Sequence, residues 1–184
     1  GMHSMQRKGL FVGAFAPYGY QKDPENKHHL IVDTTAALVV ERIYEEYLQG
    51  ISPKEIAAGL TRDGIVNPAV YKRLHGSNFR CSKKISDEEV HWRGDGVKKI
   101  LMDEIYTGTL VQHKQVQKKL TDDKPTQVAK DQWIRCEGTH EAIISRERWK
   151  IAQSMMKTIK RDSTKEDEVT IFKGLLKCGD CRHA

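Results

Sequence analysis

The chain has 184 residues, of which 38% are hydrophobic and 30% are charged. This length suffices for one domain with a hydrophobic core or for two small ones, and no apolar run approaches the roughly 20 residues of a membrane span. The formal net charge is +6, and residues 66–119 hold eleven basic against six acidic residues, a local +5. That segment suggests a polyanionic partner, and the alternative is an ordinary solvated basic surface.

The first eight residues show no pattern of a folded element. Gly1 ahead of Met2 is not a natural translation start, so we expect residues 1–8 to be a tag remnant and linker. This stretch lacks the apolar core of a secretory leader. Cys81 and Cys136 show no pairing pattern and fit free thiols in a reducing compartment. We therefore expect a cytoplasmic protein.

Short strands and then a helix are predicted for the first part of the chain. Residues 10–20 mix aromatic residues with glycine, which favours short extended pieces and turns. HHLIVD at 28–33 is a further predicted strand. Apolar residues then recur at helical spacing and predict a helix over 35–49, with Thr34 or Thr35 as its cap.

The clearest local signal is SPKEIAAGLTRDG at 52–64. Ser52 is a suitable N-cap, Pro53 takes the first helical position, and Glu55 completes a capping box. Gly64 is a natural C-terminal stop. Together these residues predict a helix over 52–63.

Residues 66–91 show no sustained period and many polar side chains, so we expect a long loop with little regular structure. A loop of this length in a compact domain is either functional or disordered. A short helix is predicted over 95–104, with Asp95 as its cap. Its inward-facing residues would be Val97, Ile100 and Leu101, which leaves Lys98 and Lys99 on the flank.

A hairpin and a last helix complete the predicted elements. The strand expected over 107–117 can pair with 132–138, with turns and a loop between them. Ser145 is a suitable cap for a helix that continues to about residue 161. Residues 162–168 are polar and predict a linker, and 169–177 is an extended apolar lead-in to the terminal cysteines.

These elements predict an α+β fold: a helix-turn-helix-like helical core with short strands and a wing-like hairpin. The helices expected over 52–63 and 95–104 would form the helix-turn-helix pair. In such motifs the second helix enters the DNA major groove and flanking basic groups hold phosphates. The spacing alone is only moderately specific, because any three-helix core produces a similar pattern.

Several segments resemble, in order, the recombinase domain of large serine recombinases. They are GLFVG at 9–13, PYGY at 17–20, LIVD at 30–33, ISPKEIAAGLTRDGI at 51–65, the stretch from Trp92 to Leu101, IYTG at 105–108 and THEAIISRERW at 139–149. The resemblance covers about residues 9–160, so we expect a DNA-binding recombinase domain over 9–161. The family often has Asn just before I-Y-x-G, where this chain has Asp103 and Glu104. That acidic helix end disfavours close approach of the DNA backbone there.

The resemblance implies a phage or mobile-element integrase that binds double-stranded attachment-site DNA and acts as a dimer or tetramer. Such enzymes cut both strands through a serine nucleophile in a domain that precedes this one, and nothing like it precedes Gly9. We therefore expect this fragment to bind its site without catalysis, and without a cofactor or a small-molecule substrate.

The candidate DNA-binding residues are basic side chains on the predicted helices, the insertion and the hairpin, and the alternative for each is a solvated surface. The candidates on the helix over 95–104 and just before it are Arg93, Lys98 and Lys99. Those in the insertion are Lys72, Arg73, Arg80, Lys83 and Lys84. Lys54 and Arg62 belong to the preceding helix, and Lys114 and Lys118 to the hairpin.

KCGDCRHA at 177–184 ends the chain on a Cys-x-x-Cys pair. Cys178 and Cys181 can bind one side of a zinc ion, but a structural site needs four ligands. A redox pair would need a thioredoxin-like setting, which the sequence does not indicate. In the family a zinc ribbon follows the recombinase domain, so we expect 169–184 to be its truncated start, with zinc bound only in the full-length protein.

Other patterns receive structural interpretations. Tyr18 and Tyr20 are expected to pack a turn against the core, and Ser145 to cap a helix rather than act as a nucleophile. Two alternative functions remain open from sequence. One is a winged-helix transcription regulator with a small zinc ribbon, and the other is a protein-interaction module whose basic face meets an acidic partner.

Overall fold

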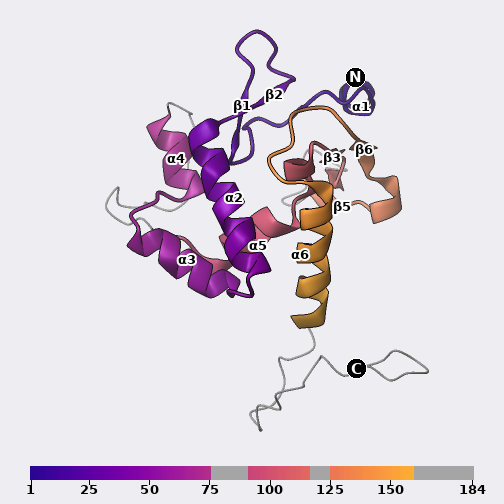
Figure 1. The fold of residues 1–184 in the computed structure, drawn as a ribbon. Coiled ribbons are helices and arrows are strands. Elements are labelled where there is room, and N and C mark those ends of the chain that lie inside the picture. Colours follow the sequence, from indigo (N-terminus) through magenta and orange to yellow (C-terminus); the bar gives the residue numbers. More distant parts are fainter. Residues whose placement is uncertain (76–90, 117–124, 160–184) are drawn as a thin grey trace, which may run out of the picture.

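The computed structural model describes residues 1–75, 91–116 and 125–159, and these form helices with short antiparallel strand pairs (Figure 1). The α+β class expected from the sequence is confirmed. In chain order the elements are α1 (Met2–Arg7), β1 (Tyr20–Lys22), β2 (Leu30–Val32), α2 (Thr34–Leu48), α3 (Pro53–Arg62), α4 (Pro68–Leu74), α5 (Gly94–Met102), η1 (Glu104–Thr107), β3 (Leu110–Gln112), β4 (Gln115–Val116), β5 (Thr126–Gln127), η2 (Lys130–Gln132), β6 (Ile134–Cys136) and α6 (Arg146–Ile159).

The first helices begin at side-chain caps. Asp33 caps α2, because its backbone is extended and its carboxylate accepts a hydrogen bond from the Ala36 N–H at 3.3 Å. The expectation that Thr34 or Thr35 caps this helix was therefore wrong by one or two residues. The capping box of α3 is confirmed: Ser52 Oγ accepts from the Glu55 N–H, and the Glu55 carboxylate accepts from the Ser52 N–H.

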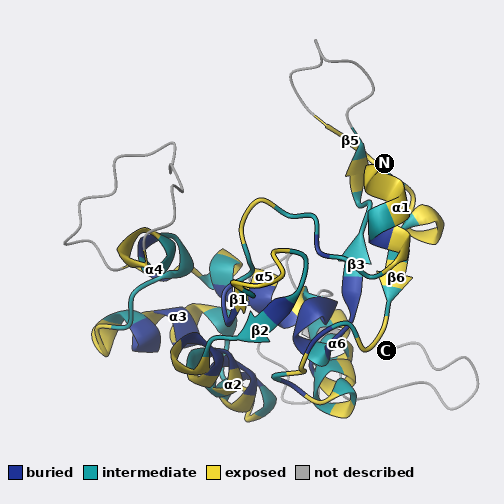
Figure 2. Ribbon diagram, turned by 90° about the horizontal axis from the view of Figure 1, so that it is seen from above, coloured by how far each residue is buried: buried dark blue, intermediate teal, exposed yellow. Residues whose placement is uncertain are grey.

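The core lies where α2, α3 and α5 meet. Each helix turns its apolar stripe inward and a polar face outward, which Figure 2 shows as a change from buried to exposed across α2 and α3. Among the described elements, α3 packs most extensively against α5. The side chains fully withdrawn from water include Val40, Ile43, Tyr44, Ile56, Leu60, Val97 and Leu101. The inward stripe predicted for the helix after residue 94 is confirmed.

A helix stands in the segment that the sequence predicted as a loop. Asn67 caps α4 by accepting hydrogen bonds from the Ala69 and Val70 N–H groups, and Pro68 opens the helix. Val70 is buried, and Tyr71 stands edge-on to Tyr18 with ring centroids 5.3 Å apart. The prediction failed because seven residues with one fully buried side chain show no helical period, although the Asn-Pro pair is a start signal.

Both ends of α5 differ from the prediction by one or two residues. The helix begins at Gly94, with Arg93 as N-cap, so Asp95 lies in the first turn and is not the cap. It ends at Met102, because Asp103 adopts extended backbone angles and its carboxylate caps η1 by accepting from the Ile105 N–H.

Buried side chains satisfy the carbonyl groups at the C-terminal end of α5. The Tyr44 hydroxyl donates to the Ile100 and Leu101 carbonyl oxygens, at 3.2 and 3.1 Å. The Gln153 side-chain amide, from α6, donates to the same Leu101 oxygen at 2.6 Å. The last carbonyls of a helix have no partner within it, so these contacts join α2 and α6 to the end of α5.

The expected hairpin forms in two sections. Strand β3 pairs antiparallel with β6, with Leu110 opposite Cys136, and β4 pairs with β5 further along. Two residues separate β3 from β4 in the first arm of the hairpin. Six residues separate β5 from β6 in the second arm, and η2 lies among them. His113, in the first arm, adopts a left-handed backbone conformation. The hairpin prediction is confirmed, and its irregular centre was not foreseen.

The remaining helices lie beside the hairpin. Helix α1 occupies residues expected to be a linker, and its Gln6 is buried near Cys136, whose thiol donates to the Gln6 carbonyl at 3.4 Å. Helix α6 follows Ser145, whose hydroxyl accepts from the Arg148 N–H as expected. Tyr18 and Tyr20 are buried, so the prediction that they pack a turn is confirmed.

Replacing Tyr44 by Phe should destabilise the fold. The substitution removes the donor and leaves two buried carbonyl oxygens with fewer partners, which costs about 1–2 kcal/mol. Chemical denaturation of the wild type and the variant measures the difference. Tyr47→Phe is a matched control, because Tyr47 is equally buried and its hydroxyl forms no hydrogen bond to the described residues. Equal stability of the two variants would contradict the role assigned to Tyr44.

Acidification should weaken the fold through His140. Burial lowers the pKa of this imidazole below its usual 6.5, with a smaller effect from His29 in the same direction, while a hydrogen bond to the Ile105 carbonyl opposes the shift. The unfolded chain then binds a proton at a higher pH than the folded one, so the free energy of unfolding should fall as the pH drops below 6.5. Denaturation at pH 7.5 and 5.5 measures this, and His140→Gln should reduce the loss. His91, which is exposed, is the control. If the free energy of unfolding falls by as much in His140→Gln as in the wild type, but by less in His91→Gln, the role assigned to His140 is contradicted.

Candidate nucleic-acid interface

Three of the predicted contact residues surround one hollow on the surface of α3 and α5. The hollow has a volume of about 580 Å³. Lys54 lies in the first turn of α3, Arg62 is its last residue, and Arg93 immediately precedes α5. All three side chains are exposed. The structure thus brings together cations that are up to 39 positions apart in the sequence.

The outer stripe of α5 carries the two lysines expected there. Lys98 and Lys99 are exposed, as are Asp95 one turn before and Met102 one turn after them. The first turn bears little bulk, because Gly94 and Gly96 have no side chains. A Cβ atom at Gly94 would lie 3.4 Å from the Lys54 Cα atom, so α5 begins in close contact with the start of α3.

Hydrogen bonds fix the N-terminal end of α5 to the end of α3. The Trp92 N–H donates to Thr61 Oγ1 at 2.9 Å, and the indole N–H donates to the Ile65 carbonyl at 2.9 Å. The Asn67 side-chain amide donates to the His91 carbonyl at 3.1 Å. These bonds hold residues 91–92 beside 65–67. The start of α5 therefore lies next to the end of α3, although 31 residues separate Arg62 from Gly94.

The predicted contacts of the insertion divide into described and undescribed residues. Lys72 and Arg73 both lie on α4. The Lys72 ammonium group is 5.9 Å from the centre of the Phe15 ring, and burial lowers its pKa. Arg73 is exposed. Arg80, Lys83 and Lys84 lie outside the described residues, so the structure does not place them near the hollow or away from it.

Lys114 is the described candidate on the hairpin, and it already has partners. Its ammonium group lies 3.6 Å from an Asp103 carboxylate oxygen and 5.6 Å from the centre of the Trp133 ring. A contact with a polyanion would therefore compete with Asp103. Lys118 lies outside the described residues.

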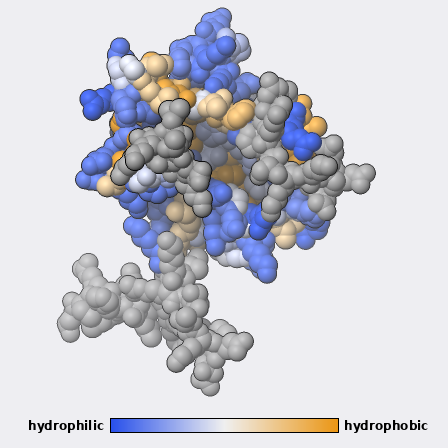
Figure 3. Space-filling view, turned by 180° about the vertical axis from the view of Figure 1, so that it is seen from behind, coloured by the Kyte–Doolittle hydropathy of each residue, from blue (hydrophilic) through white to orange (hydrophobic). Residues whose placement is uncertain are grey.

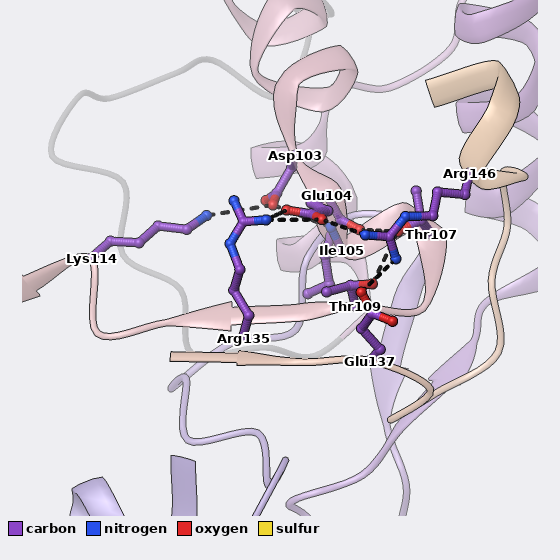
Figure 4. A network of polar contacts seen from close by, with 9 residues as sticks. All are labelled: Asp103, Glu104, Ile105, Thr107, Thr109, Lys114, Arg135, Glu137 and Arg146. Carbon is purple, nitrogen blue, oxygen red and sulfur yellow. Dashed lines mark hydrogen bonds and ion pairs between the residues drawn. The ribbon is translucent and has the colours of Figure 1, made fainter. Parts of the chain in front are cut away.

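The acidic pair at the end of α5 is neutralised by basic side chains, as Figure 4 shows. Glu104 is buried and binds two guanidinium groups, Arg135 from β6 at 3.1 Å and Arg146 from α6 at 3.6 Å. With Lys114 on Asp103 and Glu137 on Arg146, the network holds three cations and three carboxylates. The sequence indicated an acidic helix end that would keep DNA away, but these cations neutralise the acidic pair. Sequence reasoning missed Arg135 and Arg146, because their partner lies about 30 or more residues earlier in the chain.

The described residues contain neither a metal-binding cluster nor a membrane-spanning helix. No cluster of three or more metal-binding side chains occurs among the described residues. Within them, no helix is long and apolar enough to cross a membrane. The face seen in Figure 3 is mainly hydrophilic, with small separate hydrophobic areas. Cys178 and Cys181 lie outside the described residues, so the zinc half-site stays a prediction.

The structure therefore defines a class: an α+β domain whose exposed cationic helix is held by a neighbouring helix and flanked by a hairpin. Comparison with protein families identifies the family within this class. Residues 34–158 match the family model described as Recombinase. The chain belongs to the Recombinase family, and the family expected from the sequence is confirmed.

Relatives and solved structures agree with this assignment. "Uncharacterized protein YefB" of Bacillus subtilis (strain 168) is 34% identical over 93 residues, which cover 50% of this chain and 31% of that protein. The solved structure "Crystal Structure of a LSR-DNA Complex" superposes with a TM-score of 0.55 at 15% identity, over 97% of this chain and 45% of that one. "Sequence Requirements of the Listeria innocua prophage attP site" gives 0.51 at 16% identity, over 88% and 55%. These likenesses show the fold, and the chain spans about half or less of each match.

Proposed function

We propose that this chain is the DNA-binding region of a large serine recombinase and recognises the attachment-site DNA of a mobile element. The observation that carries the proposal is the position of α5. It exposes Lys98 and Lys99 along one stripe, and its N-terminal end adjoins the hollow lined by Lys54, Arg62 and Arg93. Two structural neighbours support the same function, since one is a DNA complex and the other concerns a prophage attP site.

In this proposal α3 and α5 act as a helix-turn-helix pair, and α5 enters the major groove. The positive end of the helix dipole favours phosphate near its first residues. The Arg93 side chain makes no capping hydrogen bond there, and Gly94 and Gly96 add no bulk. Lys54 and Arg62 then hold the phosphate backbone, while the outer stripe of α5 meets base edges and the phosphates that border the groove.

Strand cleavage belongs, in this proposal, to another part of the whole protein. A serine recombinase forms a phosphoserine linkage and exchanges DNA ends within a tetramer. The Recombinase family model covers residues 34–158, and we propose that this region supplies site recognition for integration or excision. Assembly of the whole protein into dimers or tetramers, and zinc binding through Cys178 and Cys181, stay predictions.

A salt-titrated binding assay tests the function. Labelled duplexes carrying the junctions between the element and its host are compared with scrambled duplexes of equal length by fluorescence anisotropy. Recognition predicts much tighter binding to the junction duplex at every salt concentration, because base contacts add to the salt-dependent phosphate contacts. Equal weak binding to both duplexes would contradict recognition and would favour a basic module for an acidic protein partner. A winged-helix regulator would bind its own operator and not the junctions.

Neutralising the outer stripe of α5 should weaken binding selectively. The double variant Lys98→Gln/Lys99→Gln should bind the junction duplex about tenfold or more weakly. Its slope of log affinity against log salt should fall by up to about two, since each lost phosphate contact removes about 0.9. The matched control is Lys150→Gln/Lys157→Gln, which neutralises two exposed lysines of α6. Equal losses in both double variants would exclude a specific role for α5.

A further inference from the structure

The junction between α5 and the hairpin contains a carboxylate that α5, β6 and α6 share. We propose that Glu104 is a positioning residue for DNA binding: it holds Arg135 on β6 at a fixed place relative to α5, so that Arg135 and the lysines of α5 meet the DNA backbone together. This inference rests on the proposed function. It adds Arg135 as a contact residue, and it assigns a positioning role to Glu104, which the sequence indicated only as part of an acidic helix end.

Glu104 is a buried carboxylate between two arginines. Its side chain is 7% exposed, and its carboxylate forms ion pairs with two arginines, which both lie near one of its oxygens. Arg135 Nη1 lies 3.1 Å from one oxygen and 3.3 Å from the other, and Arg146 Nη2 lies 3.6 Å from the second. Figure 4 shows the two arginines reaching the carboxylate from opposite sides. Glu104 comes two residues after the last residue of α5, and its carboxylate thus joins β6 and the start of α6 to the end of α5.

Stability alone does not account for this arrangement. Burying the Glu104 carboxylate costs free energy, and ion pairs with two partly exposed guanidinium groups often fail to return it, so a well-packed apolar residue would stabilise as well or better. What an ion pair adds over apolar contact is direction, since a guanidinium group must face the carboxylate in one orientation. The arrangement therefore favours fixed relative placement of α5 and the hairpin.

Arg135 keeps N–H donors that do not bind Glu104. Its side chain is 53% exposed, and it bonds Glu104 through Nη1 only, among the described residues. A guanidinium group has five N–H donors, so the outward N–H groups can bind a phosphate while Nη1 stays on Glu104. Arg146 is more occupied, because its other nitrogen binds Glu137 at 2.8 Å.

Asp103, the residue before Glu104, pairs with the other arm of the hairpin. Its carboxylate lies 3.6 Å from the ammonium group of Lys114, which stands between β3 and β4. Both arms of the hairpin are thereby joined to two consecutive residues at the end of α5. Met102, the exposed last residue of α5, immediately precedes Asp103, so the exposed stripe of α5 ends beside this junction. Phosphates that contact Lys99 would be followed along the backbone by those that reach the hairpin.

Glu104→Gln tests the positioning role, because the amide keeps the size of the side chain and loses its charge. The variant and the wild type are compared on the junction duplex by anisotropy at several salt concentrations and by hydroxyl-radical footprinting, with thermal unfolding as the check on folding. We expect affinity to fall at least fivefold and the salt slope to fall by about one. The footprint should lose protection on the hairpin side and keep it on the α5 side.

Glu137→Gln is the matched control, since it removes a carboxylate from the same network without touching Arg135. It should bind like the wild type. Arg135→Gln leaves Glu104 paired with Arg146 and should reproduce the one-sided loss of protection. If Glu104→Gln does not fold, an unchanged salt slope in Arg135→Gln overturns the proposal.

Other outcomes also separate the two levels of inference. Unchanged affinity and footprint in a folded Glu104→Gln would overturn the positioning role while the proposed function stands. A uniform loss of protection along the whole site would reduce Glu104 to a purely structural residue and also overturn it. If the wild type itself does not prefer the junction duplex, the proposed function fails and the positioning role falls with it.

Discussion

The structure depends on how the C-terminal end of α5 is held. This helix has nine residues, from Gly94 to Met102, too few to be stable alone in water. Its last carbonyl groups accept hydrogen bonds from Tyr44 and Gln153, which come from helices on either side. Because buried carbonyl groups without partners are costly, these side chains fix both the end of α5 and its rotation, and hence which residues face outward.

The N-terminal end of α5 is also fixed in place, by hydrogen bonds from the residue Trp92. Trp92 donates to Thr61 and to the Ile65 carbonyl, so the helix begins beside the end of α3. A helix fixed at both ends presents its outer stripe at a defined angle, which suits the reading of a DNA groove. Glu104 and Asp103 extend this rigidity to the hairpin. In our proposal, the cations on α5 and on the hairpin are then parts of one preformed surface.

Local signals in the sequence predicted the elements whose causes are local. The capping box at Ser52 and Glu55, the inner stripe of α5 and the pairing of β3 with β6 were all foreseen. Helix α4 was missed because tertiary packing of Val70 and Tyr71 holds it, and seven residues give no period. The pairing of Glu104 with Arg135 and Arg146 was missed for a related reason: contacts between residues 31 and 42 positions apart leave no trace in spacing.

The central claim is that the outer stripe of α5 faces DNA, and site-specific photo-crosslinking tests it most directly. Met102 on α5 and Leu38 on α2 are both exposed apolar residues, at 56% and 66%. A photoreactive amino acid at either site should leave the fold intact. Our account predicts a crosslink to the junction duplex from position 102, removed by unlabelled competitor, and none from position 38. Crosslinking from position 38 alone would contradict it and place the DNA on the α2 face.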